Sequence, residues 1–295
     1  MQIKNYKDIF KKELLPIYDE QEIESFFYII LEKLHSLKRI DLALQPQTIL
    51  DGSHLKQWKS IVSDLKNQKP IQYILGETEF YGLRFEVNEN TLIPRPETEE
   101  LVELIVKEEG KRKREEEKLK ILDIGTGSGC IAISLATNIP NAEVFAIDVS
   151  EKALATAKKN AKSNKVGVNF ITTDILKIDD LAKLPTSNLQ LPTSFDIIVS
   201  NPPYVRNLEK AEIKPNVLEF EPHLALFVDD TDALLFYRKI AQLARKNLTA
   251  NGKLYFEINQ YLGNETVQLL KDLGFSNVEL KKDIYGNDRM IMCYS

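Results

Sequence analysis

Apolar residues in the first part of the chain recur at steps of three and four, the spacing of one buried helix face. This spacing runs across Ile23–Leu34 and again across Leu55–Leu65. Asp51 or Ser53 stands where a side chain can cap the start of the second helix. We therefore expect residues 1–75 to form a small helical domain.

The pattern changes after residue 75, where the apolar residues Phe80, Leu83, Phe85 and Val87 occur with the turn residues Gly82 and Asn88. We expect residues 76–94 to form a β-hairpin that links the two larger parts. Pro96 then suits the first turn of a helix, and the acidic residues that follow favour the positive end of its dipole.

From Lys120 onward, short apolar segments alternate with amphipathic ones. The expected strands are KILDIG, EVFAID, VNFITTD, FDIIVS, KLYFEI, VELKKD and RMIMCYS. Strands alternating with helices are typical of a mostly parallel sheet covered on both faces. The last two strands are separated by a short turn, so we expect an antiparallel hairpin at the sheet edge. The sequence predicts an α/β fold, Rossmann-like, with a seven-stranded mostly parallel sheet in a domain spanning 95–295.

Composition limits the class of protein. The 295 residues are 43% hydrophobic and 28% charged, which is typical of a globular chain of about two domains. The net charge of −5 argues against a broad nucleic-acid-binding face. The only cysteines, Cys130 and Cys293, allow no disulfide framework, and no spacing suggests a metal site. With no apolar signal or membrane segment in view, we expect a cytoplasmic protein.

A glycine-rich turn follows the first strand of the second domain. Gly125, Gly127 and Gly129 lie between that strand and the next helix. Such a turn lets the backbone approach a ligand at the carboxyl end of a strand. It also occurs for purely structural reasons. The spacing is G-x-G-x-G, and Cys130 stands where a dinucleotide-binding fingerprint would have its third glycine or an alanine.

Acidic residues end the next two strands. Asp148 lies 25 residues after Asp123, where a carboxylate can accept from both hydroxyls of a ribose. Its alternative role is to cap the helix that begins near Ser150. Asp174 is placed to accept from the exocyclic amine of an adenine, with Ile175 as an apolar wall, unless the pair simply forms a turn.

The fourth strand stops at the tetrapeptide Asn201-Pro202-Pro203-Tyr204. Two prolines make the corner stiff and leave its carbonyl groups free to accept hydrogen bonds. The Asn201 side chain adds a further acceptor, and the Tyr204 ring can pack against a planar group. The alternative is a strand end with a packed tyrosine.

A planar NH₂ group suits this corner. An amide or aromatic amine nitrogen is a poor nucleophile, because its lone pair is delocalised and no base removes its proton at neutral pH. Two acceptors can fix the N–H directions and aim the lone pair at an electrophilic methyl group. The carbonyl dipoles of Asn201 and Pro202 would then meet the positive charge that develops on nitrogen. We therefore expect Asn201, Pro202 and Tyr204 to be catalytic.

The run DIGTGSGC, the acidic end of the second strand and NPPY together resemble the class I S-adenosylmethionine-dependent N-methyltransferases. The segments Gln72–Glu103 and Tyr285–Arg289 extend the likeness over the whole chain, and it resembles the release factor glutamine methyltransferase family. The resemblance implies methyl transfer from S-adenosyl-L-methionine to the side-chain amide nitrogen (N5) of the glutamine in the Gly-Gly-Gln motif of class-1 peptide chain release factors. The product of the donor is S-adenosyl-L-homocysteine.

The resemblance also implies roles for individual residues. Cofactor binding falls on Gly125, Thr126, Gly127, Ser128, Gly129, Asp148, Asp174, Ile175 and Asn201. Substrate binding falls on Asn201, Pro202, Pro203 and Tyr204, with Phe80, Arg95 and Glu97 bordering the cleft. For Arg95 and Glu97, ion pairs within the linker are an equal alternative. We expect the helical domain to dock the release factor, and we expect no direct contact with nucleic acid or a membrane.

Three other functions fit parts of the pattern. A nucleic-acid methyltransferase acting on adenine N6 or guanine N2 would also use NPPY, because those amines are planar. A nicotinamide-dependent oxidoreductase would share the sheet, and a non-catalytic module would bind the cofactor alone. We expect structural roles for His223, Trp58 and Cys130.

Overall fold

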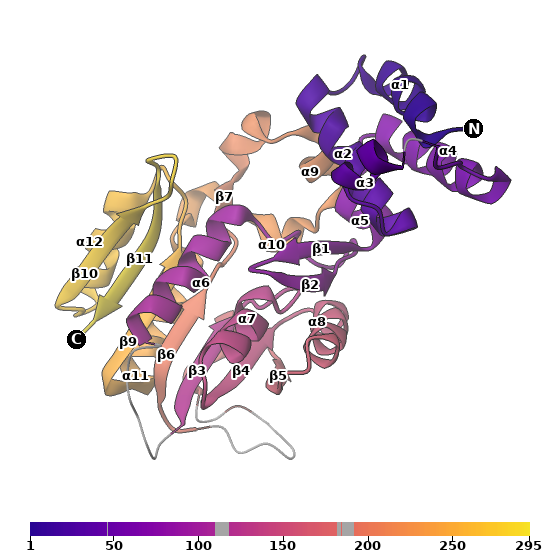
Figure 1. The fold of residues 1–295 in the computed structure, drawn as a ribbon. Coiled ribbons are helices and arrows are strands. Elements are labelled where there is room, and N and C mark those ends of the chain that lie inside the picture. Colours follow the sequence, from indigo (N-terminus) through magenta and orange to yellow (C-terminus); the bar gives the residue numbers. More distant parts are fainter. Residues whose placement is uncertain (46, 110–117, 182–183, 185–191) are drawn as a thin grey trace. The chain divides into compact units, whose positions relative to one another are not determined.

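Figure 1 traces the computed structural model of the chain. It describes residues 1–45, 47–109, 118–181, 184 and 192–295. These residues separate into two compact units. The first consists of Met1–Gly76 together with Lys214–Phe220, and the second of Glu77–Ile213 and Glu221–Ser295. The first unit therefore takes one of its segments from the middle of the second.

The first unit is built from helices around aromatic side chains. Its helices are α1 (Ile3–Leu14), α2 (Glu20–His35), α3 (Arg39–Leu44), α4 (Gly52–Lys66), α5 (Ile71–Leu75) and α9 (Pro215–Phe220). The Trp58 ring has no exposed surface and lies 5.1–5.7 Å from the rings of Tyr6, Phe10 and Phe27. Asp51 caps α4 by accepting from the His54 N–H at 2.8 Å. The predicted helical periodicity and the structural role of Trp58 are confirmed.

The predicted hairpin is also confirmed. Strand β1 (Glu77–Phe80) pairs antiparallel with β2 (Leu83–Glu86), and Gly82 turns between them at a φ of +72°. It is not a free linker, however. Phe80 and Phe85 are buried in the same cluster as residues of the sheet and its helices, so the hairpin belongs to the second unit.

A mixed seven-stranded sheet forms the centre of the second unit, as the sequence predicts. Its strands are β3 (Leu119–Ile124), β4 (Ala142–Asp148), β5 (Val168–Thr172), β6 (Phe195–Ser200), β9 (Leu248–Glu257), β10 (Asn277–Lys282) and β11 (Asp288–Tyr294). Their order across the described sheet is β10-β11-β9-β6-β3-β4-β5. The five strands from β9 to β5 are parallel, and β11 runs antiparallel to both β9 and β10. The expected antiparallel edge hairpin is therefore present.

Helices and short segments complete this unit. They are α6 (Pro96–Glu109), α7 (Cys130–Asn138), α8 (Glu151–Ser163), α10 (His223–Leu226), α11 (Leu235–Asn247), α12 (Gly263–Asp272), the 3₁₀ helices η1 (Ile175–Lys177), η3 (Asn207–Glu212) and η4 (Asp230–Asp232), and the small strand pair β7 (Val205–Arg206) and β8 (Phe227–Val228). Pro96 opens α6 with Glu97 and Glu99 in its first turn, as predicted.

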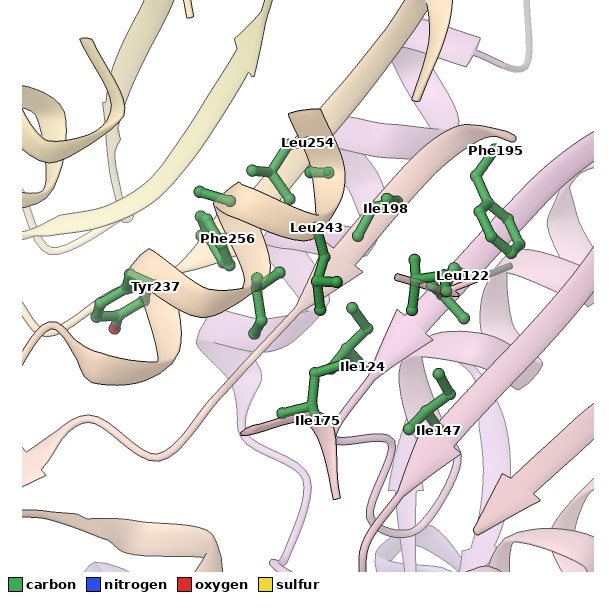
Figure 2. Packing of buried hydrophobic residues seen from close by; sticks show 14 of the residues in the cluster. Leu122, Ile124, Ile147, Ile175, Phe195, Ile198, Tyr237, Leu243, Leu254 and Phe256 are labelled. Atoms are coloured by element: carbon green, nitrogen blue, oxygen red, sulfur yellow. The ribbon is translucent and has the colours of Figure 1, made fainter. Parts of the chain in front are cut away.

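Alternating side chains of the strands fill two apolar layers. Leu122 and Ile124 pack with residues of α11 and α12 on one face, and Figure 2 shows the α11 part of this layer with Tyr237 and Leu243. Ile121, from the same strand, packs with residues of α6 and α7 on the other face. Both faces are thus covered, and the exposed parts of the parallel strands are their ends.

The parallel strands place several loops at one edge. The carboxyl ends of β3, β4, β5 and β6 lie side by side, because these four strands are parallel neighbours. This edge is where ligands bind in open α/β sheets. None of the helices in the described part of the chain is long and apolar enough to cross a membrane.

Candidate functional site

The glycine turn after β3 requires its glycines. Gly125, Gly127 and Gly129 have φ values of +77°, +56° and +83°, in the region where other residues are strained. A Cβ on Gly129 would lie 2.9 Å from Ile133 Cδ1 and 3.1 Å from Ala157 Cβ. The turn is thereby packed closely against α7 and α8, which fixes the position of its backbone.

Hydrogen bonds of Asp123 and Thr126 fix the glycine turn to the sheet. The Thr126 hydroxyl donates to Asp123 Oδ2 at 2.6 Å, and both side chains are buried. Burial raises the pKa of the Asp123 carboxyl to about 7. The Thr126 N–H donates to the Ile147 carbonyl at 3.0 Å. These bonds connect the turn to β3 and β4.

A cavity of about 340 Å³ opens beside this turn. Its wall contains backbone of the turn, the end of β4, the segment after β5 and the corner after β6. Apolar walls come from Leu92, Ile147, Ile175, Leu224, Phe236 and Ile240. The size and lining are typical of a site for a small organic molecule.

Asp148 ties the end of β4 to the turn. Its Oδ2 accepts from the Gly127 N–H at 2.8 Å, and its Oδ1 accepts from the Ser150 N–H at 2.8 Å. Ser150, rather than Asp148, caps α8, since its hydroxyl accepts from the Ala153 N–H. Burial raises the pKa of the Asp148 carboxyl. Each carboxylate oxygen still has a lone pair for a ligand hydroxyl.

Asp174 and Ile175 both line the cavity. Asp174 also forms the turn that the sequence left as its alternative role: its Oδ1 accepts from the Leu176 N–H at 3.1 Å, and its Oδ2 pairs with Lys177 at 3.2 Å. The Ile175 side chain is 8% exposed and packs against the core while it forms part of the wall. A strand-end turn and a cavity wall therefore coexist here.

The Asn201–Tyr204 corner forms another wall. Asn201, Pro202 and Pro203 line the cavity. A Cβ placed on Gly125 would come within 4.0 Å of the Asn201 carbonyl oxygen, so the corner and the glycine turn are adjacent. Directly before the corner, the Ser200 hydroxyl donates to the Ile124 carbonyl at 2.6 Å, which fixes β6 to β3 at this point.

A buried polar cluster supports the corner from behind. Glu257, at the end of β9, is 1% exposed and accepts from the Tyr204 hydroxyl at 3.0 Å and the Thr98 hydroxyl at 2.6 Å. Thr98 in turn accepts from Asn201 Nδ2 at 3.3 Å. The Tyr204 carbonyl accepts from Asn259 Nδ2 at 3.0 Å. Burial raises the pKa of both Glu257 and Tyr204.

The tyrosine of the corner therefore differs from expectation. The Tyr204 ring packs against the core and is not part of the cavity wall, because its hydroxyl is held by Glu257. Thr126, Ser128 and Gly129 are likewise absent from the wall, and the first two are buried within the turn. They shape the turn, while Gly125 and Gly127 face the cavity.

Phe80 and Glu97, which the resemblance placed at the border of the cleft, lie outside the cavity wall. Phe80 is 1% exposed and packs edge-on against Phe85 with ring centres 6.0 Å apart, so it does not border the cavity. Glu97 is half-buried and, by its charge, contributes to the raised pKa of Glu257. Neither side chain is in the wall.

Arg95 forms an ion pair, but its partner is 126 positions away and not within the linker, where the sequence-based alternative placed it. Its Nη2 lies 2.5 Å from Oε1 of Glu221, which is buried and accepts from the Ile93 N–H at 3.0 Å through Oε2. Leu92 and Pro222, next to the residues so joined, line the cavity from the two segments. The pair therefore connects two parts of the wall.

Sequence reasoning missed Thr98, Glu221, Glu257 and Asn259. Thr98 and Glu257 are 159 positions apart, and no local pattern marks their pairing. The weak signal available was that Glu257 and Asn259 are polar residues at the end of an apolar strand. Burial raises the pKa of the Cys130 thiol to about 12, which agrees with its expected packing role. The described residues contain no group of three or more side chains suited to hold a metal ion.

Comparisons with known proteins agree with this geometry. Residues 11–76 match the model of the PrmC N-terminal domain, and residues 115–285 match a model described as a methyltransferase domain. The release factor glutamine methyltransferase of Flavobacterium psychrophilum is 66% identical over 99% of this chain and 98% of its own length. The enzyme of the same name from Bacteroides thetaiotaomicron is 43% identical over 95% and 96%.

Solved structures show the same fold at low identity. The catalytic domain of hMettl16 in complex with a 3′UTR hairpin aligns with a TM-score of 0.53 and 15% identity, covering 83% of this chain and 82% of that one. The human methyltransferase 10 domain containing protein aligns with a TM-score of 0.52 and 16% identity, covering 72% and 89%. At this identity the two similarities show a shared fold alone.

Proposed function

Because this chain belongs to the release factor glutamine methyltransferase family, we propose that its cavity binds S-adenosyl-L-methionine and that the Asn201–Tyr204 corner binds the glutamine of a release factor. The observation that carries the proposal is that the glycine turn and the corner line one cavity. A methyl donor held by the first would face an amide held by the second. The enzyme class, a methyltransferase, follows from the family.

The residues present fit S-adenosyl-L-methionine. Gly127 has open space where a Cβ would stand, so ligand atoms can approach the backbone there. Asp148 retains acceptor capacity for the ribose hydroxyls, and Asp174 lies where it can accept from the adenine amine. Ile175 and Leu224 supply apolar walls for a flat base. When bound, this donor supplies a methyl group activated by a sulfonium centre.

The corner suits an amide nitrogen. The carbonyl groups of Asn201 and Pro202 would accept the two N–H hydrogens of the glutamine side chain and fix the direction of its lone pair. The same dipoles would stabilise the positive charge that develops on nitrogen. Before the transfer the nitrogen needs orientation rather than deprotonation, because its lone pair attacks while both hydrogens are still present. The methylated nitrogen is then cationic and loses one of these protons to solvent, so the site requires no histidine. Tyr204 stiffens the corner through Glu257 rather than through contact with the substrate.

The helical unit would then dock the release factor. It carries apolar side chains that are largely exposed, among them Ile40 at 61%, Leu44 at 73% and Ile49 at 66%. A Gly-Gly-Gln loop of the substrate has to reach the cavity while the bulk of the release factor is held elsewhere. A surface on a separate unit would supply that hold.

Methyl transfer from labelled donor to a purified class-1 release factor tests the proposal. Mass spectrometry of the digested product should place one added methyl group on the glutamine of the Gly-Gly-Gln motif. DNA and ribosomal RNA, offered in parallel, represent the nucleic-acid alternative. Methylation of nucleic acid with an unmodified release factor would overturn the proposal.

A further inference from the structure

We propose that Glu257, acting through Thr98, is a positioning residue that fixes which end of the Asn201 side-chain amide faces the substrate nitrogen. The proposal rests on the proposed function, in which the Asn201 carbonyl accepts from the glutamine amide. It adds a cause for that orientation, because an asparagine side chain can otherwise present either its carbonyl or its NH₂ group.

Three elements bring these side chains together. Glu257 ends β9, Thr98 lies in the first turn of α6, and Asn201 follows β6. The Thr98 hydroxyl is 2.6 Å from Glu257 Oε2, and Asn201 Nδ2 is 3.3 Å from Thr98 Oγ1. Thr98 and Glu257 are 2% and 1% exposed, so water does not compete for the bond between them.

The direction of each hydrogen bond follows from the chemistry of a carboxylate. Burial raises the pKa of Glu257, but the hydrogen bonds from Thr98 and Tyr204 and the positive charge of Arg289 oppose this shift and favour the ionised form. An ionised carboxylate has no hydrogen to donate, so Glu257 accepts on both oxygens, from Thr98 and from Tyr204. The single hydroxyl hydrogen of Thr98 is thereby committed to Glu257. Its oxygen then acts as the acceptor for the Asn201 NH₂ group.

This hydrogen-bond pattern determines which end of the Asn201 amide is available to a ligand in the cavity. With its NH₂ group bonded to Thr98, the Asn201 amide leaves its carbonyl oxygen at the other end. A carbonyl oxygen there can accept a hydrogen bond from the substrate NH₂ group. An NH₂ group of Asn201 in that place could not, because both groups would be donors. A buried mismatch of two donors costs binding, because neither group finds an acceptor.

The substitution Glu257→Gln removes this constraint with little change of shape. Glutamine has one accepting and one donating end, so it can donate to the Thr98 oxygen. The Thr98 hydrogen is then free to bond the Asn201 carbonyl, and the amide can turn over. We expect kcat for release factor to fall by at least ~10-fold, with S-adenosyl-L-homocysteine affinity within about 2-fold of the unmodified protein.

A second measurement reports orientation directly. A release factor whose target glutamine is replaced by glutamate presents an acceptor instead of a donor. In the presence of S-adenosyl-L-homocysteine, Glu257→Gln should bind this variant more tightly, relative to the glutamine form, than the unmodified protein does. Because Glu257→Gln also removes a negative charge, the same ratio is measured for Thr98→Val, which changes no charge and should shift it in the same direction. A residue that only supports the fold would weaken both forms alike.

Matched variants complete the experiment. Thr98→Val removes the relay oxygen and should resemble Glu257→Gln in kcat, whereas Thr98→Ser keeps a hydroxyl and should retain more activity. Glu109→Gln is the control: Glu109 is a buried glutamate of α6 paired with Lys253 of β9 at 3.0 Å, outside the cavity wall. It should leave both kcat and the affinity ratio unchanged.

The inference is overturned if Glu257→Gln keeps both the kcat and the affinity ratio of the unmodified protein, or if Thr98→Ser loses as much activity as Thr98→Val. The affinity comparison measures binding and does not require methyl transfer. If the unmodified protein binds the release factor but does not methylate it, the proposed function is contradicted. The affinity ratio would still test the inference about Glu257 in that case.

Discussion

The Asp148 carboxylate accepts a hydrogen bond from the Gly127 N–H at 2.8 Å, which joins the end of β4 to the glycine turn after β3. The acidic strand end and the glycine turn are therefore one structural element, although 21 positions separate the two residues. A change in either residue should alter the other's position, and the first prediction follows from this connection.

Asp148→Asn should weaken binding of S-adenosyl-L-homocysteine by about 10- to 100-fold. Both carboxylate oxygens accept from backbone N–H groups, of Gly127 and Ser150, so an amide must turn its NH₂ group towards one of them. Calorimetric titration measures the affinity. Asp229→Asn is a control, because Asp229 accepts from Thr231 outside the cavity wall. Equal affinities of Asp148→Asn and the unmodified protein would contradict the prediction.

Alanine at Gly129 and at Gly127 should separate stability from binding. Gly129→Ala places a Cβ 2.9 Å from Ile133 at a φ of +83°, and should lower the free energy of unfolding by about 1–3 kcal/mol. Gly127→Ala carries left-handed backbone strain as well, at a φ of +56°, but it meets no neighbouring atom, so it should cost less stability than Gly129→Ala. It also adds a methyl group to the cavity wall, so it should lower ligand affinity.

Thermal unfolding and calorimetry test this pair together. Gly52→Ala in α4, where the backbone is not left-handed and nothing lies within 4 Å, should leave both measurements nearly unchanged. If Gly127→Ala loses as much stability as Gly129→Ala, the close contacts of Gly129 with Ile133 and Ala157 are not what makes its substitution costly.

His35 should make the stability of the helical unit depend on pH. Its Nε2 accepts from the Trp58 N–H at 2.9 Å, which requires a neutral ring at that nitrogen. Burial, followed by the neighbouring His54, lowers the pKa of His35, and Asp51 opposes this shift. The unfolded chain therefore binds the proton more readily, and stability should fall as pH drops below the ordinary histidine pKa of about 6.5.

Fluorescence of Trp58, the single tryptophan, monitors this equilibrium during denaturant titration. The decrease in stability between pH 7.5 and pH 5 should be smaller in His35→Gln, whose side-chain oxygen can accept from Trp58 without titrating. Identical decreases in the two proteins would exclude His35 as the cause.

Docking by the helical unit predicts a selective effect on KM. The double variant Ile40→Ser, Leu44→Ser removes two exposed apolar side chains of α3, a helix with no buried residue. KM for an intact release factor should rise several-fold, while KM for a short Gly-Gly-Gln peptide stays the same. Ile284→Ser, in the second unit, is the exposed control.

These substitutions are preferable to deleting residues 1–75, because deletion would leave Lys214–Phe220 without the rest of its unit. A parallel rise in both KM values would argue against docking.

The fold could be read from the sequence because its signals are local. The stripe Ile23–Leu34 and the strand–turn–helix around Gly125 each specify an element within a few residues. The packing of the hairpin was not predicted in the same way. Phe80 fits a cleft or a core equally well as a sequence feature, and only its contact with Phe85 and the neighbouring cluster decides for the core.

The candidate site was predictable where its residues follow strand ends, as Asp148 and Asn201 do. Its supporting cluster was not, because Thr98 and Glu257 come from elements far apart in the chain. Tyr204 illustrates the same limit. Its place in the tetrapeptide suggested contact with substrate, while the partner that holds its hydroxyl lies 53 positions away.

The composite first unit, Met1–Gly76 with Lys214–Phe220, has a consequence for how such a protein can be recombined. A chimera joined only at residue 76 would bring a foreign helical module without the segment 214–220 that completes it. An exchange of the helical unit between two such proteins must therefore carry two separate stretches of sequence at once.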